Sequence, residues 1–376
     1  MMDMRRLLAY TNHIVPSLLA LAVCLFSGCE KSATHKVTDG LGNDYISFSG
    51  RTSDGYAVKS SEPSEDGSTP NLATTDILKT KPFGIFGGKS YDGKTNFSSV
   101  FQTDRAQLVE WKEEGTTRKW TYDPKQKWER AMHYRFRAVW PYVERNVKAN
   151  SSANLLSVTY HSLNEDYDLM VAYAKRYPLE EGVEKVELKF KHALAGLRFI
   201  VKYSSDCATK DPDAITEFYL TGIYSQGQLF YGHAQENSDD ESMIWDLSEY
   251  TFNVDTPQFH WPNSKGVTEG KTIPFGGDEN TEANVYFTNT TSGPDGAALI
   301  VPQKLSSQRG DTYVHFRTKL GGKALHTVKL PETQPETQLK AGKIYTFTLS
   351  INETTITIDG KVQDWKEIPS NTDIIL

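Results

Sequence analysis

The sequence predicts an all-β protein that contains two β-sandwiches in series. Its composition is the first observation: 19 Tyr, 17 Phe and 7 Trp occur among many Thr and Ser, and aromatic and β-branched residues favour strands. The second is a series of short segments in which apolar and polar residues alternate, ended by turn residues. The third is that no segment repeats apolar residues at helical spacing over three turns. Short strands at regular spacing, in two series, indicate two sandwiches.

Residues 1–28 have the pattern of a lipoprotein signal peptide. Arg5 and Arg6 form a basic start, an apolar stretch covers residues 14–26, and small residues precede Cys29. We predict cleavage between Gly28 and Cys29 and acylation of Cys29, with each buried methylene contributing roughly 0.8 kcal/mol to anchoring. The alternative is an ordinary signal peptide followed by an incidental cysteine. The apolar stretch is short and contains Pro16, so we do not expect it to remain as a spanning helix.

Charge and cysteine content exclude several classes of protein. The net charge of -7 comes without any basic run, so no nucleic-acid partner is expected. The three cysteines are Cys24, Cys29 and Cys207. Cys24 leaves with the signal and Cys29 carries lipid, so no intramolecular disulfide is expected. We therefore predict a lipid-anchored protein of the bacterial outer membrane or cell surface.

The remaining chain divides into a tether and two domains. Residues 29–43 are polar and form the tether, residues 44–181 the N-terminal domain, and residues 182–376 the C-terminal domain. The boundary is placed at residues 178–182, where Pro and Gly interrupt the strand pattern.

The N-terminal domain is predicted to begin with a short strand, residues 44–49, whose Ile46 and Phe48 face the core. A polar loop follows, made of residues 50–55 and the polar stretch 60–70. Further expected elements are a core strand at 81–87, a hairpin across Asp123-Pro124, a strand at 134–140 with one buried face, and a strand at 168–173 buried on both faces.

The C-terminal domain is predicted to begin with a strictly alternating strand at 186–191, with a solvated Glu/Lys face. The next expected strands are residues 197–203, 215–223, 227–231, 284–289, 298–301 and 343–351. Residues 355–358 are expected to pair back, and Asp359-Gly360 predicts a tight turn after them.

Tests for catalytic, nucleotide and metal motifs are negative or weak. Gly88-Lys89-Ser90 resembles the end of a phosphate-binding loop, but Phe83 stands where that loop needs Gly, so a hairpin turn at Gly87-Gly88 is favoured. His192 has no second ligand at metal-site spacing and is expected to be a packed, hydrogen-bonded histidine. The acidic run 239–241 lacks the spacing of a calcium loop. We expect no enzyme activity, no cofactor and no metal.

The run from Val186 to Leu197, VELKFKHALAGL, resembles a strand of the fimbrillin-like proteins of Bacteroidales. Other segments are similar to that family in the same order, and together they span nearly the whole chain. They are the lipid-acceptor pattern at Cys29, KPFGIF at 81–86, YRFRAVWP at 134–141, DLMVA at 168–172, and LKAGKIYTFTL at 339–349 followed by Val362 and Trp365.

This resemblance implies two transthyretin-like β-sandwich domains and a role as a fimbrial subunit. In the family, a protease cuts after an Arg and removes the first strand, and a strand from a neighbouring subunit fills the groove. Here the removable strand would be Tyr45, Ile46, Ser47, Phe48 and Ser49, and the cut would follow Arg51. An ordinary loop arginine is the alternative for Arg51. The apolar terminus Ile374, Ile375 and Leu376 is a candidate donor segment.

Two functions are therefore open. The first is a structural or adhesive fimbrial subunit or surface lipoprotein, with other fimbrial subunits as partners. The second is a glycan-binding surface lipoprotein that does not polymerise, in which Trp111, Trp120 or Trp128 stack on sugar rings. The same tryptophans also suit a sandwich core, and that interpretation is favoured. Host or bacterial surface glycans or proteins are the adhesion partners considered.

Overall fold

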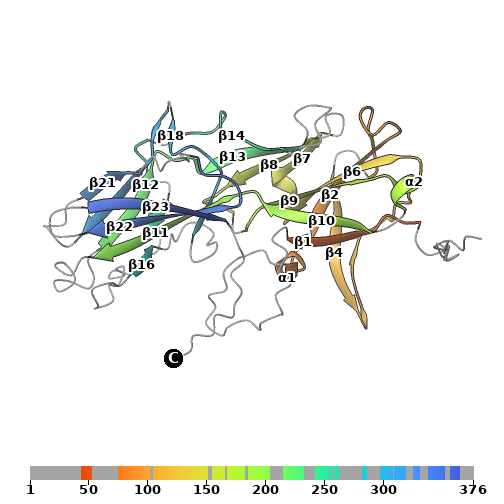
Figure 1. Cartoon of the computed structure of the whole chain (residues 1–376), viewed down its shortest axis with the longest axis horizontal. Coiled ribbons are helices and arrows are strands. Elements are labelled where there is room, and N and C mark those ends of the chain that lie inside the picture. Colours follow the sequence, from red (N-terminus) through yellow and green to blue (C-terminus); the bar gives the residue numbers. More distant parts are fainter. Residues whose placement is uncertain are drawn as a thin grey trace, which may run out of the picture. The chain divides into compact units, whose positions relative to one another are not determined.

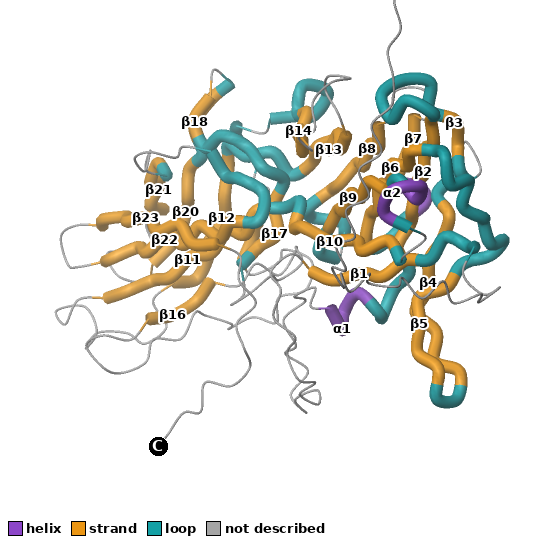
Figure 2. Tube along the Cα trace, turned by 45° about the vertical axis from the view of Figure 1, so that its right-hand side comes forward, coloured by secondary structure: helices purple, strands orange, loops and turns teal. Residues whose placement is uncertain are grey.

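A computed structural model describes most of the chain after residue 43. It covers residues 44–52, 75–101, 105–150, 155–165, 167–182, 185–203, 215–232, 242–252, 254–256, 259–261, 282–285, 297–307, 309–318, 325–330, 338–351 and 356–364. Strands dominate, and α1 (Thr75–Leu78) and α2 (Pro178–Glu181) are short helical turns, as Figure 2 shows. A third short turn, η1, covers Glu144–Asn146. The predicted all-β class is confirmed. In the part of the chain described, no helix is long and apolar enough to cross a membrane.

The largest sheet has eight strands. Across it the order is β1 (Phe48–Thr52), β10 (Val186–His192), β9 (Met170–Arg176), β6 (His133–Trp140), β2 (Phe83–Ser90), β4 (Gln107–Glu114) and β5 (Thr117–Thr121), and β3 (Ser98–Ser99) pairs with β2. The β1 strand runs parallel to β10, whereas the other neighbours are antiparallel. In Figure 1, β1 lies beside β10 at the edge of this sheet.

Four smaller sheets complete the described fold. One joins β7 (Val147–Asn150), β8 (Leu155–His161), β13 (Gln226–Gly232) and β14 (Ser242–Asp246). A second joins β11 (Ala195–Tyr203), β16 (Glu282–Val285), β17 (Ala298–Ile300), β22 (Lys343–Ile351) and β23 (Ile356–Asp364). A third joins β12 (Ile215–Thr221), β15 (Phe259–Trp261), β20 (Tyr313–Thr318) and β21 (Leu325–Lys329). The last pairs β18 (Ser306–Ser307) with β19 (Gly310–Asp311).

The β10 and β6 strands show how far alternation predicts burial. In β10, buried Val186, Leu188 and Phe190 alternate with exposed residues, as predicted. In β6 both faces are buried, so the prediction of one buried face is wrong. Arg135 and Arg137 occupy the second face because their guanidinium groups lie over aromatic rings, 4.5 Å from the centre of Phe97 and 5.2 Å from that of Tyr173.

Three of the predicted hairpin turns are not formed at the predicted positions. The β5 strand pairs with β4 across Gly115, which has φ +60°, so the hairpin predicted at Asp123-Pro124 is wrong. Gly87-Gly88 lies inside β2, opposite Phe136 and Arg135 of β6. Asp359-Gly360 lies inside β23, opposite Thr348 and Phe347 of β22. In the last two places, long antiparallel registers override a local preference for a turn, because each ladder satisfies backbone hydrogen bonds that a turn would leave to water.

The buried apolar residues form three clusters. An N-terminal core lies on the eight-stranded sheet and includes Phe48, Phe83, Phe136 and Phe190. A C-terminal core includes Phe199, Phe218, Phe316 and Phe347. A central core draws on β6, β8, β9, β13, β17 and β22. Strands before and after residue 181 therefore share the central core, and the domain boundary at 181/182 stays a prediction.

A buried pair of polar side chains lies where β10 leaves the large sheet. Asp168 Oδ2 lies 2.7 Å from His192 Nδ1, and the two residues are 1% and 4% exposed. A backbone hydrogen bond joins the two segments next to this pair, since Ala193 N donates to Leu169 O at 2.8 Å. His192 is thus the packed, hydrogen-bonded histidine that the sequence predicted.

We expect Asp168→Asn to lower the free energy of unfolding by about 1 kcal/mol, the approximate difference between a hydrogen bond to a charged group and one to a neutral group. Urea denaturation of both proteins measures this difference. Asp44→Asn is the control, because the Asp44 side chain is 67% exposed. Equal midpoints for the two variants would contradict a stabilising role for the buried pair.

Candidate functional site: the edge strand β1

The segment that contains β1 has two successive pairing partners. From Phe48 to Thr52 it runs parallel to β10, with Phe48 opposite Val186 and Thr52 opposite Phe190. Before β1, Ile46 N donates to Gln126 O at 2.8 Å, and Trp128 N donates to Asp44 O at 2.8 Å. The predicted strand at 44–49 is therefore displaced: its first residues pair with residues 126–128, and β1 itself begins at Phe48.

Two side chains of this segment enter the N-terminal core. Ile46 and Phe48 are each 1% exposed. The Phe48 ring lies 5.3 Å from the Phe136 ring, 5.6 Å from the Tyr122 ring and 6.3 Å from the Phe101 ring, measured between ring centres. Such contacts contribute beyond the buried area alone. The inward orientation of Ile46 and Phe48 is as the alternation predicted.

Gly50 and Thr52 bring the backbone of β1 close to the core. A Cβ atom added to Gly50 would lie 3.2 Å from Cε2 of Phe190 and 3.8 Å from Cε1 of Phe83. The absence of a side chain at Gly50 thus lets β1 lie directly on the Phe190 ring. Thr52, the last residue of β1, is only 1% exposed. Phe48, Gly50 and Thr52 of the strand therefore lie against the core, on alternate positions.

Arg51 lies inside β1, opposite Lys189, so its predicted place in a polar loop is wrong. The side chain is 40% exposed and pairs with Glu187 of β10. The physical reason is that the parallel ladder with β10 continues to Thr52, beyond the point where the sequence turns polar. Exposed ion pairs contribute little stability, so the backbone ladder and the core contacts hold the strand more than this ion pair does.

The far edge of β1 is the outer edge of the sheet. In the strand order β1 is terminal, and no strand within the described residues pairs with its other side. The Tyr122 hydroxyl donates to Ile46 O at 2.8 Å, just before β1 begins. An edge strand of this kind is the element of a sheet that can be replaced with the fewest broken backbone contacts.

Several residues that the sequence singled out lie outside the described residues. They are Gly28, Cys29, Cys207, the acidic run 239–241, Trp365, and the candidate donor residues Ile374, Ile375 and Leu376. Among the residues that the structure covers, no group of three or more His, Cys, Asp or Glu side chains is placed to hold a metal ion.

The three tryptophans considered for sugar binding are used in packing. Trp128 is 7% exposed and lies 4.7 Å from the Tyr134 ring. Trp120 packs against the N-terminal core, with its ring 5.0 Å from that of Phe83. Trp111 lies edge-on to Trp120 at 5.4 Å.

The partners of residues 44–46 were missed by sequence reasoning. Gln126 and Trp128 bind this segment through the backbone, and Tyr122 through its hydroxyl. The apolar character of Tyr122 and Trp128 signalled burial, but a pairing between segments about 80 residues apart leaves no periodic signal in one sequence.

Comparison with known proteins places this fold in context. A family model described as fimbrillin-like matches residues 73–365. No curated protein matches the chain. A fimbrial protein from Bacteroides vulgatus is 17% identical with a TM-score of 0.52, over 86% of this chain and 100% of that one. This level of identity supports a shared fold.

Two further structures are similar at lower scores. One is a candidate cell adhesion protein from Bacteroides uniformis, 12% identical with a TM-score of 0.46, over 86% of this chain and all of that chain. The other is a fimbrial assembly protein from Parabacteroides distasonis, 11% identical with a TM-score of 0.39, over 85% of this chain and 99% of that chain.

Proposed function

Because the chain belongs to the fimbrillin-like family, we propose that it is a non-enzymatic structural and adhesive subunit of a fimbrium at the bacterial cell surface. The match to the family over residues 73–365 carries this proposal. The all-β fold supports it, since sheets with exchangeable edges can be joined from subunit to subunit. The proposed partners are other fimbrial subunits.

Anchoring is proposed to come from the N-terminal segment. The basic start, the apolar stretch and Cys29 match the pattern of lipoprotein processing. Acyl chains on Cys29 would hold the precursor in the outer membrane, with residues 30–43 as the tether to the first strand.

Assembly is proposed to proceed by exchange of the first strand. Three features of the segment that contains β1 support this: β1 is at the sheet edge, its backbone pairs with β10, and Phe48 together with the preceding Ile46 fills apolar sites. A cut after Arg51 would leave the strand attached by non-covalent contacts alone. A strand from a neighbour, for which residues 374–376 are the proposed donor end, would then satisfy the same β10 backbone and the same apolar sites.

The test is a substitution that removes the arginine and keeps its charge. We expect an arginine-specific protease to convert wild-type protein into a ladder of polymers on a non-boiled gel. Arg51→Lys should remain monomeric, because lysine preserves the cation beside Glu187 but is not cut by such a protease. Arg118→Lys is the matched control, since the Arg118 side chain is 70% exposed on β5.

The position of Arg51 within β1 adds a kinetic expectation. The end of the strand must leave β10 before a protease can bind it in extended form, so cleavage should accelerate in mild urea. Sequencing of the product should give Thr52 as the new N-terminus. A ladder from Arg51→Lys equal to that of wild type, or none from wild type, would show that release of β1 does not drive assembly.

A further inference from the structure

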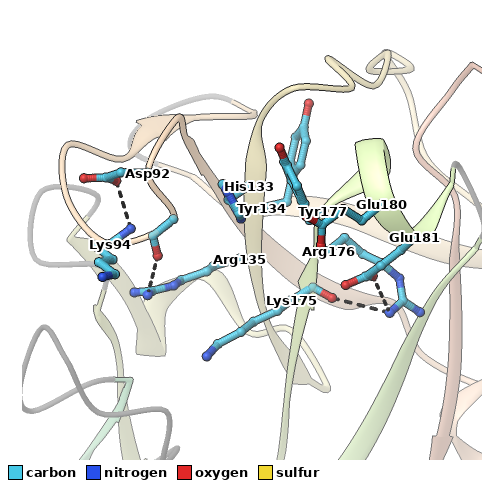
Figure 3. Close-up of a pocket in the computed structure, with 11 residues that line it drawn as sticks. Asp92, Lys94, His133, Tyr134, Arg135, Lys175, Arg176, Tyr177, Glu180 and Glu181 are labelled. Carbon is cyan, nitrogen blue, oxygen red and sulfur yellow. Dashed lines mark hydrogen bonds and ion pairs between the residues drawn. The ribbon is translucent and has the colours of Figure 1, made fainter. Parts of the chain in front are cut away.

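A polar cavity of about 730 Å³ opens on the large sheet at the start of β6 and the end of β9. Three separate segments line it: the turn after β2, the start of β6, and the end of β9 with α2. The lining residues used below are Lys94, His133, Arg135, Tyr177, Glu180 and Glu181. The volume falls in the range of roughly 300–1,000 Å³ typical of small-molecule sites. Figure 3 shows the arrangement.

One wall of this pocket is aromatic and fixed. The rings of His133 and Tyr177 are stacked, with centres 3.9 Å apart and planes within 3°. Gly93 packs against the same imidazole: an added Cβ would lie 2.9 Å from Cγ of His133, and the φ of +66° also favours glycine. The imidazole thus contacts both Gly93 and Tyr177, and the half-buried Tyr177 supplies an aromatic ring to the lining of the pocket.

A second wall carries positive charge. Arg135 is 7% exposed, its Nη2 donates to Gly93 O at 2.7 Å, and its guanidinium lies over the Phe97 ring. These contacts fix the guanidinium in one orientation. Lys94 is exposed beside it and has no ion-pair partner among the residues described. In Figure 3 the cationic ends of Lys94 and Arg135 lie on the same side of the pocket.

Three carboxylates line the pocket, and Asp92 has a different role from Glu180 and Glu181. Asp92 accepts hydrogen bonds from the Lys94 and Thr95 backbone N–H groups, both at 2.9 Å, and from the Thr95 hydroxyl at 2.6 Å. The Thr95 hydroxyl and these N–H groups hold the pKa of Asp92 well below its usual range. Its charge therefore supports the turn. Glu180 and Glu181 lie on the opposite side from Lys94 in Figure 3, and Glu181 pairs with Arg176 at 3.4 Å.

We propose that this pocket binds the acidic sugar residue of a saccharide, a uronic or sialic acid. The sugar carboxylate would pair with Arg135 and Lys94, because a fixed guanidinium recognises a planar carboxylate. The C–H face of the ring would lie on Tyr177, and hydroxyl groups would donate to Glu180 and Glu181. A simple anion such as phosphate satisfies only the cationic side, and an apolar ligand satisfies neither charged side. Acidic sugar chemistry matches both sides and the aromatic wall.

The inference is independent of polymerisation, so it is tested on the uncut, monomeric chain. Calorimetric titration compares sialyllactose and a glucuronic-acid disaccharide with lactose, inorganic phosphate and a short peptide that has a free C-terminal carboxylate. We expect one or both acidic saccharides to bind at least roughly tenfold more tightly than lactose, phosphate or the peptide. Lactose lacks the charged hydrogen bond to the cationic side, whereas phosphate and the peptide lack the sugar contacts to Tyr177, Glu180 and Glu181. The stronger of the two identifies the acid.

Variants connect the binding to the pocket. Lys94→Glu should weaken binding of the acidic saccharide roughly tenfold or more, whereas Lys94→Arg should retain it. Lys119→Glu is the charge-matched control on β5, outside the pocket. The inference is overturned if no saccharide binds, if lactose, phosphate or the peptide binds as well as the acidic sugars, or if Lys119→Glu weakens binding as much as Lys94→Glu does. The gel test of Arg51 is unaffected by any of these results.

Discussion

Phe48→Ala is expected to lower the free energy of unfolding by about 3–5 kcal/mol, the cost typical of truncating a buried phenylalanine. The Phe48 side chain is 1% exposed and touches the rings of Phe101, Tyr122 and Phe136. The backbone of β1 has little freedom to move into the space that the Phe48 ring leaves, because Gly50 already lies against Phe190. Urea denaturation of the uncut chain measures the loss.

Tyr45→Ala is the control for this result. Tyr45 is an aromatic residue of the same segment, but it is 46% exposed. Surface truncations of this kind usually change stability by no more than about 0.5 kcal/mol. If Phe48→Ala changed the denaturation midpoint as little as Tyr45→Ala does, β1 would not be anchored by its apolar side chains, and the proposed exchange would lose its main energetic basis.

Gly222→Ala is expected to destabilise the chain by about 2–5 kcal/mol, through two separate effects. Gly222 follows β12 with φ +66°, a conformation that costs an L-residue about 1–2 kcal/mol. The new Cβ would also lie 1.9 Å from the carbonyl oxygen of Asp311. Relief of that overlap requires the backbone at Asp311 in β19 to move, at about 1–3 kcal/mol. Thermal or urea unfolding measures the sum.

Gly115→Ala separates these two effects. Gly115 has nearly the same conformation, φ +60°, but an added Cβ meets nothing within 4 Å. Only the conformational cost of about 1–2 kcal/mol applies there. The difference between the two variants therefore reports the overlap with Asp311. Equal losses would show that the backbone near Asp311 yields without cost.

Sequence patterns correctly predicted strands that have one buried face and one solvent-exposed face. The alternation in β10 gave the correct buried set, because Glu187, Lys189 and Lys191 must remain in water. The β6 strand was harder. Its Arg135 and Arg137 suggest a solvated face, yet aromatic rings from other segments cover both guanidinium groups. A single sequence does not record which distant rings will be available.

The candidate site was predicted only in part for the same reason. Ile46 and Phe48 were identified by their spacing, but the place of Arg51 inside β1 depends on β10, more than 130 residues later. The pocket next to Tyr177 left no signal, since its walls come from residues near 93, 134 and 177. A parallel pairing and a cavity built from three segments are both products of the tertiary fold.

The parallel pairing of β1 with β10 also determines how the molecule responds to pulling. If the chain is held through the end of β1 that begins at Phe48 and loaded through the parts that follow β10, the two strands are drawn in opposite directions along their common axis. The backbone hydrogen bonds from Phe48 to Thr52 are then strained together in shear. An antiparallel edge pulled from the same two ends would open one bond at a time. The parallel pair therefore resists a load applied at the start of β1 better than an antiparallel pair of the same length would.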